Sequence, residues 1–400
     1  MKSGATMSSL VRRLERSGSV RFDEFVEHAL YDVDDGFFAT GGGAGRAGAD
    51  FVTSPEVGPL FGAVVARALD TCWDELGRPD PFVVVEAAAG RGALAIAVLA
   101  AAPRCAPALR YVLVERSAEL RARQRDHLEV VEPFEVLGPD PDPDTTLPNE
   151  TLPDEALPDE ALPDEALRDA GGSGPLVTSL AELPSVRVQG VLLANELLDN
   201  VPFRLLERTA EGWGEVFVVL DRDGSLGEVV VPAEDTVVEL ADRLAPDATV
   251  GARIPLQAGA SRWLRRALDV VERGRLIVVD YCSTTPELAA RPAQEWLRTY
   301  RAHGRGGPPL LAPGSQDITC EVAVDQLAAV DGPTLETTQA DWLRRHGLEE
   351  LVDEGRRIWA EGAHAPDLHT IRGRSRVVEA EALTDPTGLG AFTVLEWDRS

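Results

Sequence analysis

Short apolar segments alternate with helical segments along much of this chain, and this alternation limits its fold more than any other feature. Five segments have the apolar character of strands buried on both faces: Phe82–Glu86, Arg110–Glu115, Leu176–Ser179, Gly190–Ala194 and Leu276–Asp280. Helical patterns follow the first two, at Ala93–Ala102 and Ala118–Leu128. This arrangement is typical of parallel strands that helices cover on both sides. We therefore predict a doubly wound α/β sheet.

Three regions that do not follow this alternation predict additions to the sheet. Before it, Phe22, Phe25, Val26 and Ala29 share one helical face, and a second helix starts at Ser54-Pro55-Glu56 and runs to Leu69. Within it, Phe203–Leu220 and Gly227–Val231 alternate in polarity around turn signals, as antiparallel strands do. At the C-terminus we expect a closing hairpin formed by Arg374–Glu379 and Ala391–Trp397.

These patterns predict a two-part organisation. Residues 1–78 form an N-terminal helical cap with a glycine-rich loop, and residues 79–400 form the main domain. The main domain carries a β-rich insertion at 203–258 and an acidic, disordered insertion at 139–174. The acidic insertion contains a five-residue repeat, and its regular prolines exclude a continuous helix.

Charge and residue usage exclude several classes of partner. The net charge of −28 argues against nucleic-acid binding, which depends on Lys and Arg that neutralise phosphates. The longest apolar stretch is interrupted by charged residues and glycines, so we expect no membrane span and, without a signal-peptide pattern, a cytoplasmic protein. The four cysteines and six histidines show no metal-binding spacing, so we expect no metal site.

A candidate nucleotide site follows the first strand, where the chain reads EAAAGRG over Glu86 to Gly92 and enters a helix. The second strand ends in Glu115, whose carboxylate can accept both ribose hydroxyls of an adenosine ligand. Gly90-x-Gly92-x-x-Ala95 formally matches a dinucleotide fingerprint, but Glu86 before the loop would repel a pyrophosphate and suits a cationic ligand. The sequence therefore favours S-adenosylmethionine, with a nicotinamide dehydrogenase and a purely structural glycine turn as the alternatives.

Seven ordered segments of the chain carry a family resemblance: Asp50–Gly62, Val83–Ala95, Tyr111–Gln124, Gly190–Arg204, Val278–Tyr281, Tyr300–Thr319 and Thr337–Gly347. In this order they resemble the MidA-like methyltransferases, and the match extends over nearly the whole chain except the acidic insertion. That family includes a mitochondrial complex I assembly factor that dimethylates an arginine of a core complex I subunit. One difference is that Ala88-Ala89 stands where the family loop usually has Gly-Pro.

The resemblance implies a class I methyltransferase (Rossmann-like) fold, S-adenosyl-L-methionine as cofactor and a protein arginine as methyl acceptor. The residues it places around the cofactor are Glu86, Ala88, Gly90, Gly92, Glu115, Asn195, Thr53, Ser54 and Pro55. An arginine acceptor is cationic and needs carboxylates to hold it. For this catalytic role we predict Glu196 first, then Asp199, with help from Asp50.

Two other functions stay open at this stage, namely a small-molecule methyltransferase and a non-catalytic assembly factor that binds S-adenosylmethionine. The expected partner is a protein substrate. Oligomeric state is undecided, with a homodimer as one alternative.

Overall fold

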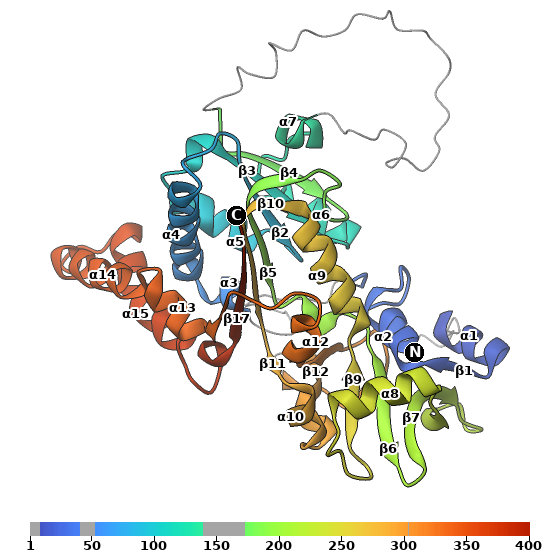
Figure 1. The fold of residues 1–400 in the computed structure, drawn as a ribbon. Helices are drawn as coiled ribbons and strands as arrows, with labels where there is room; N and C mark the ends of the chain where they lie inside the picture. Colours follow the sequence, from blue (N-terminus) through green and yellow to red (C-terminus); the bar gives the residue numbers. More distant parts are fainter. Residues whose placement is uncertain (1–8, 41–52, 139–172, 303) are drawn as a thin grey trace, which may run out of the picture.

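A seven-stranded sheet forms the core of the computed structural model, which describes residues 9–40, 53–138, 173–302 and 304–400 (Figure 1). The strand order is β16–β17–β10–β5–β2–β3–β4. The bounds are β2 Phe82–Ala87, β3 Leu109–Val114, β4 Leu176–Leu180, β5 Val188–Asn195, β10 Val271–Asp280, β16 Leu335–Thr338 and β17 Thr393–Arg399. The five strands from β4 to β10 are parallel, and β17 is antiparallel to both of its neighbours. The predicted doubly wound sheet is confirmed.

The strand order creates a ligand-binding crevice. From β2 the chain proceeds through β3 to β4 at one edge, and then β5 returns to the other side of β2. The order therefore reverses between β2 and β5. Ligands of open α/β sheets bind at the carboxyl ends of the strands beside such a reversal.

Helices cover both faces of this sheet, which accounts for its apolar strands. On one face lie α4 (Pro59–Glu75) and α5 (Ala93–Ala100), and on the other lies α9 (Ala258–Val270) (Figure 1). Strands β2 and β3 are buried along their whole length between these layers. Fully burying one large apolar side chain, such as valine or leucine, stabilises the fold by roughly 1.5–3 kcal/mol.

The helix expected to run from Ser54 to Leu69 is interrupted. It divides into α3 (Ser54–Val57) and α4, because Pro59 disfavours a helical conformation at Gly58, which is extended. Helix α4 packs Leu60, Phe61 and Val64 into the core of the main sheet.

A second, antiparallel sheet joins the N-terminal segment to the β-rich insertion. Its order is β1–β7–β6–β9, with β8 on β7. The bounds are β1 Ser19–Arg21, β6 Arg204–Thr209, β7 Gly212–Leu220, β8 Leu226–Pro232 and β9 Arg253–Leu256. Helices α1 (Ser9–Ser17) and α2 (Phe22–Tyr31) flank β1, and α8 (Asp235–Leu244) lies on the same sheet (Figure 1). The antiparallel insertion is as predicted, whereas β1 adds a strand to the expected helical cap. The proposed division at residue 78 stays a prediction.

The predicted C-terminal hairpin is wrong in its first arm. Arg374–Glu379 lies inside α15 (Leu368–Leu383), which Asp367 caps by accepting the Thr370 N–H at 2.8 Å. Helices α14 (Leu348–Gly362) and α15 cross closely where Gly355 meets Gly373, since a Cβ on Gly355 would lie 2.4 Å from the Gly373 carbonyl oxygen. The second arm, β17, pairs with β16 and β10.

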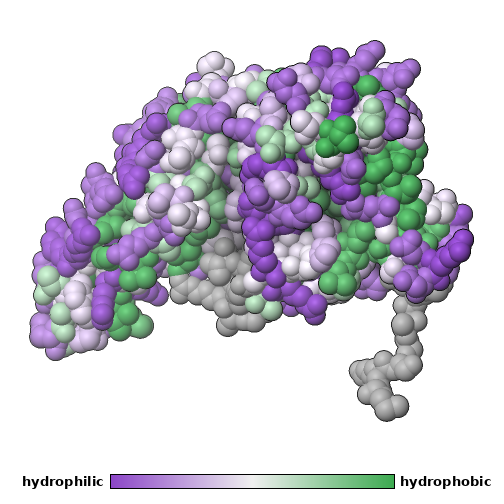
Figure 2. Space-filling view, turned by 90° about the horizontal axis from the view of Figure 1, so that it is seen from below, coloured by the Kyte–Doolittle hydropathy of each residue, from purple (hydrophilic) through white to green (hydrophobic). Residues whose placement is uncertain are grey.

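Helices α14 and α15 project from the body as a separate lobe (Figure 1), on which Figure 2 shows hydrophobic patches among hydrophilic ones. The exposed apolar side chains of α15 are Leu368, Ile371 and Val378. None of the helices in the described ranges combines the length and apolar character needed to cross a membrane.

Smaller elements complete the described chain. A three-stranded sheet of order β13–β12–β14 brings Asp317 of β14 beside Asn200, in the short helix that follows β5. The bounds are α6 Ala118–Gln124, α7 Pro133–Leu137, η3 Leu198–Asn200, β11 Cys282–Ser283, α10 Thr285–Ala289, α11 Ala293–Trp296, β12 Leu297–Arg301, β13 Gly304–Arg305, β14 Asp317–Cys320, β15 Val322–Ala323, α12 Val324–Ala328 and α13 Gln339–Arg345.

Candidate functional site

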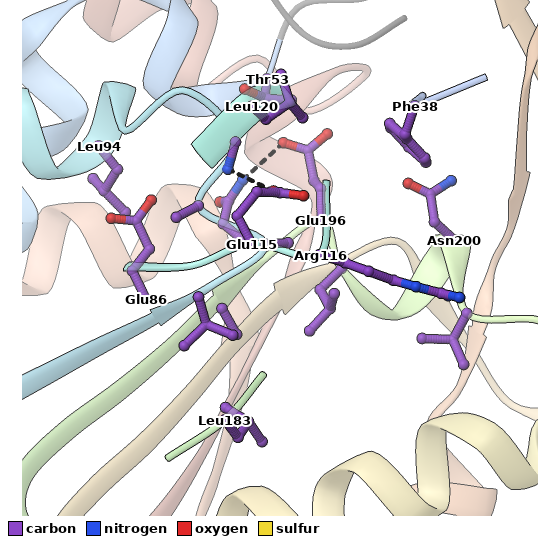
Figure 3. Close-up of a pocket in the computed structure, with 18 of the residues that line it drawn as sticks. Phe38, Thr53, Glu86, Leu94, Glu115, Arg116, Leu120, Leu183, Glu196 and Asn200 are labelled. Atoms are coloured by element: carbon purple, nitrogen blue, oxygen red, sulfur yellow. Dashed lines mark hydrogen bonds between the residues drawn. The ribbon is translucent and has the colours of Figure 1, made fainter. Parts of the chain in front are cut away.

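A cavity of about 880 Å³ opens at the carboxyl ends of β2, β3 and β5, beside the reversal of strand order (Figure 3). Its walls come from the loop after β2, the residues after β3 and β4, the turn after β5, helix α9 and the N-terminal segment. The predicted site residues that line it are Thr53, Pro55, Glu86, Ala88, Gly90, Glu115, Asn195 and Glu196. The cavity is large enough for a nucleoside ligand together with part of a second substrate.

The loop after β2 has the left-handed backbone expected of a glycine-rich ligand loop. Gly90 has φ 53° and Gly92 has φ 83°, and Ala88 has φ 58° although it carries a Cβ. A non-glycine residue in this region costs roughly 1–2 kcal/mol. Position 88, where the family loop usually has glycine, thus has a positive φ, and the chain accommodates alanine there. At Gly92 a Cβ would lie 3.0 Å from Leu128 Cδ1, a close contact that a small shift of the leucine side chain would relieve.

Glu115 faces this loop from the end of β3. Its Oε2 accepts the Gly90 N–H at 2.9 Å, and its Oε1 accepts the Ser117 N–H at 2.8 Å. Burial raises the pKa of this carboxyl above its usual range. An ionised carboxylate offers about four acceptor positions, so these backbone bonds leave capacity to accept from a ligand hydroxyl. The ribose-binding role of Glu115 stays a prediction that this geometry allows.

Glu86 lies deeper, at the end of β2. Its Oε2 accepts the Tyr111 hydroxyl at 2.7 Å, and burial raises its pKa to about 8 despite that bond and one from the Ala95 N–H. The carboxyl is therefore protonated at neutral pH until a cation approaches. A cationic amino-acid group of a ligand would favour the ionised form.

Replacing Glu86 by glutamine is expected to change how stability depends on pH. The folded carboxyl keeps its proton up to about pH 8, while an unfolded one releases it near its ordinary value of 4.5. The folded state thus holds more protons between these values, and wild-type stability falls as pH rises through this window. Glutamine should raise the free energy of unfolding by on the order of 2–4 kcal/mol at pH 8.5, and change it little at pH 5. Urea titrations at both pH values test this, and equal effects at the two would contradict it.

The turn after β5 holds Asn195 and Glu196. Asn195 Nδ2 donates to Glu196 Oε1 at 3.0 Å, and the backbone N–H of Ser54 donates to the same oxygen at 3.4 Å. Burial, with Asp199 close by, raises the pKa of Glu196 to about 8. Glu196 has φ 51°, a strained value for glutamate. Such strain is characteristic of functional sites.

Asp199 and Asp280 lie behind this turn, away from the cavity wall. Burial raises the pKa of Asp199 to about 7, and burial next to Asp199 raises the pKa of Asp280 well above its ordinary range. Asp280 Oδ2 accepts the backbone N–H groups of Leu198 and Asp199 at 2.8 and 3.3 Å. The structure therefore places Asp199 in a second layer and not on the cavity wall.

The N-terminal segment meets the site in part as predicted. Thr53 and Pro55 line the cavity, whereas the Ser54 hydroxyl is fully buried and donates to Gln339 Oε1 at 2.9 Å. The Ser54 side chain therefore fixes α3, and only its backbone reaches Glu196. Asp50 lies outside the described residues.

Among the cavity residues that were not predicted from the sequence are Tyr31, Phe38 and Arg116. Tyr31 lies on α2 and stacks against Phe38, with ring centroids 5.4 Å apart. The Arg116 guanidinium lies 4.3 Å from the Tyr31 ring centroid and donates to Glu27 Oε2 at 3.2 Å. The position of Arg116 directly after Glu115 was a usable signal, but nothing in the local sequence places α2 beside β3.

A family model described as "Putative S-adenosyl-L-methionine-dependent methyltransferase" matches residues 64–339, well over half of the chain. The chain belongs to this family. The match includes β2, β3 and β5 with all their site residues. The predicted membership in the MidA-like methyltransferases is confirmed, and the dehydrogenase alternative is set aside.

Curated relatives of this methyltransferase carry a more specific name. The zebrafish (Danio rerio) protein arginine methyltransferase NDUFAF7, mitochondrial, is 25% identical over 86% of this chain and 77% of its own length. The mouse (Mus musculus) protein of that name is 23% identical over 78% of this chain and 66% of its own length. A Drosophila melanogaster homologue is 34% identical, but the match spans only 24% of this chain and 22% of the relative.

A solved structure from Burkholderia thailandensis, bound to S-adenosyl-homocysteine, superposes with a TM-score of 0.74. It is 26% identical and covers 98% of this chain and 91% of its own. S-adenosyl-L-methionine is the cofactor of this family, and the residues here fit it. The left-handed loop and Glu115 suit a nucleoside, and Glu86 suits the cationic amino-acid group of the cofactor, which would favour its ionised form.

Proposed function

We propose that this methyltransferase transfers the methyl group of S-adenosyl-L-methionine to an arginine side chain of a protein. The observation that carries the proposal is the set of buried carboxyls around the turn after β5. Glu196, Asp199 and Asp280 form no ion pair within the described part of the chain. Buried carboxyls without a cation are costly, and a guanidinium would compensate for that cost.

The location of these carboxyls supports the same acceptor. Glu196 lines the cavity on the β5 side, while the predicted cofactor residues Glu86, Gly90 and Glu115 lie on the β2 and β3 side (Figure 3). An acceptor bound to Glu196 would therefore lie next to the cofactor. The names of the zebrafish and mouse relatives add independent support for arginine.

The chemistry needs positioning more than a strong base. The cofactor supplies a methyl group on a sulfonium, which is transferred in line to a nitrogen lone pair. Glu196 holds the guanidinium so that one nitrogen is aimed at the methyl, and it accepts the N–H proton that this nitrogen loses as the N–CH₃ bond forms and the S–CH₃ bond breaks. Correct positioning alone can contribute roughly 7–11 kcal/mol of barrier lowering.

Incubation of the protein with methyl-labelled S-adenosyl-L-methionine and a lysate of its own deletion strain tests the proposal. We expect label in protein, recovered as methyl-arginine after acid hydrolysis. Methyl-arginine proteomics of the deletion strain should show at least one site that loses its methyl group. Label found only in small molecules, or in no product, would overturn the arginine assignment.

A further inference from the structure

A buried carboxyl group lies at the root of the α14–α15 lobe and takes no part in methyl transfer. It belongs to Glu379 of α15, which is only 6% exposed, and it lies outside the wall of the cavity. No basic residue in the described ranges forms an ion pair with it. A carboxyl group buried without a cation is costly unless hydrogen bonds hold it, so its place in the fold needs an explanation.

The hydrogen bonds of Glu379 show that it caps a distant helix. Its Oε2 accepts the backbone N–H of Leu60 at 2.9 Å, and its Oε1 accepts the Ser375 hydroxyl at 2.7 Å. Leu60 is the second residue of α4, and the first N–H groups of a helix have no acceptor within it. The positive end of the helix dipole also favours a carboxylate there. Glu379 therefore fixes the start of α4, although 319 positions separate it from Leu60.

Gly58, two residues before Leu60, leaves room for this carboxyl group. A Cβ at position 58 would overlap the Glu379 carboxyl group, so a larger residue there would displace Glu379 from α4. Gly58 is also the point where α3 ends and α4 begins. Glu379 thus holds the junction between the two helices.

Helix α3, on the other side of this junction, forms part of the cavity wall. Pro55 and Glu56 line the cavity, and Glu56 lies 3.9 Å from Arg91 of the loop after β2, at ion-pair distance. Helix α3 has four residues, and so short a helix does not hold its own position. It is anchored at its first residue by a bond to Gln339 and, just after its end, by Glu379. Both anchors come from the C-terminal part of the chain, beside which α3 lies (Figure 1).

We propose that Glu379 is a positioning residue of the cofactor site, which keeps α3 against the loop after β2 by holding the α3–α4 junction. Glu379 does not touch the cofactor and acts through Pro55 and Glu56. The lobe that carries α15 is thereby required for cofactor binding. This inference depends on the cofactor of the family and not on the identity of the methyl acceptor.

Isothermal titration calorimetry with S-adenosyl-homocysteine tests this inference without a methyl acceptor. Glu379→Ala removes the cap, so the ligand must order α3 when it binds, and we expect the dissociation constant to rise at least ~10-fold. Glu379→Gln keeps an acceptor oxygen at the same place, so we expect its dissociation constant to stay within ~3-fold of the wild-type value. The matched control is Glu381→Ala, which removes an exposed carboxylate of the same helix and should leave the dissociation constant unchanged.

A second variant displaces the carboxyl group without removing it. Gly58→Ala should push Glu379 away from the Leu60 N–H and weaken S-adenosyl-homocysteine binding to a similar extent. It also serves if Glu379→Ala does not fold. The double variant should lose no more affinity than either single variant, because both changes break one contact.

Hydrogen exchange provides a measurement that needs no variant. If the cofactor and Glu379 hold the same wall, S-adenosyl-homocysteine should slow the exchange of the Leu60 amide in the wild-type protein at least ~5-fold. An amide that opens independently of the cofactor site would keep its exchange rate, and that result would overturn the inference.

The variants can also contradict the inference. A lower melting temperature in Glu379→Ala with an unchanged dissociation constant would show that Glu379 only stabilises the fold. Equal losses in Glu379→Gln and Glu379→Ala would exclude the cap as the cause, and additive losses in the double variant would exclude a shared contact. None of these results bears on the arginine acceptor, so the failure of this inference is distinguishable from the failure of the proposed function.

Discussion

Replacing Glu115 by alanine is expected to weaken S-adenosyl-L-methionine binding by about 100-fold, which corresponds to roughly 3 kcal/mol. Two ribose hydroxyls on one carboxylate form charge-assisted hydrogen bonds, each with a net contribution of roughly 1.5–3 kcal/mol. The same carboxylate accepts the N–H groups of Gly90 and Ser117, so alanine also releases the loop that contacts the ligand. Isothermal titration calorimetry measures the change directly.

Two variants separate these contributions to cofactor binding. Glu115→Gln keeps one acceptor oxygen and the size of the side chain, so we expect a loss of about 10-fold. Glu119→Ala removes a half-exposed carboxylate of α6, paired with Arg123, and should leave the affinity unchanged. An affinity that is the same in Glu115→Ala and the wild type would refute the ribose assignment.

The main sheet could be predicted from the sequence because each of its strands has a pattern that is visible within a short segment of the chain. Phe82–Ala87 and Leu109–Val114 are buried along their whole length and apolar except for Glu86 and Arg110, because helices cover both faces. The small residues that follow β2 mark the ligand loop. The carboxylates Glu86 and Glu115 stand at strand ends, where topology alone brings them to one edge. Positions of this kind do not depend on which distant segment packs against them.

The sequence predictions that missed or were wrong concern segments whose structure depends on long-range contacts. Tyr31 and Phe38 reach the cavity because β1 pairs with β7, a contact between residues nearly 200 positions apart that no local pattern encodes. Arg374–Glu379 has adjacent valines that favour a strand, but close contact with α14 through Gly373 keeps it helical. Tertiary packing decided these segments against their local propensity.

The sequence predicted where the acceptor side of the site lies, but it did not predict how its carboxyl groups are arranged. The sequence indicated that Asn195, Glu196 and Asp199 follow the fourth strand of the alternation. It did not indicate that Asp280, at the end of the neighbouring strand β10, would lie close to Asp199. Burial beside Asp199 raises the pKa of the Asp280 carboxyl. The sequence also gave no sign that Asp199 would lie behind the wall.

Replacing Glu196 by glutamine is expected to lower kcat/KM for methyl transfer by about 100- to 1,000-fold, with cofactor affinity unchanged. Removing one partner of a buried ion pair costs roughly 3–5 kcal/mol, because the other charge stays buried without compensation. Glutamine matches the shape of glutamate and can still accept from Ser54, so the strained turn at φ 51° should persist. Circular dichroism and calorimetry with the cofactor would verify that the fold and the binding site are intact.

The pH profile of this variant separates a chemical role for Glu196 from a structural one. Burial raises the pKa of Glu196 to about 8, so the wild-type rate of methyl transfer should rise with pH as this carboxyl ionises. A bound guanidinium favours the ionised carboxylate, so the midpoint of this acidic limb should lie below pH 8. Glutamine cannot ionise, so that limb should be absent in Glu196→Gln. The matched control, Glu272→Gln, changes an exposed carboxylate at the amino end of β10 and should reproduce the wild-type profile. A Glu196→Gln profile with the acidic limb intact would show that another group holds the acceptor, and Asp199 would then be the next carboxyl to replace.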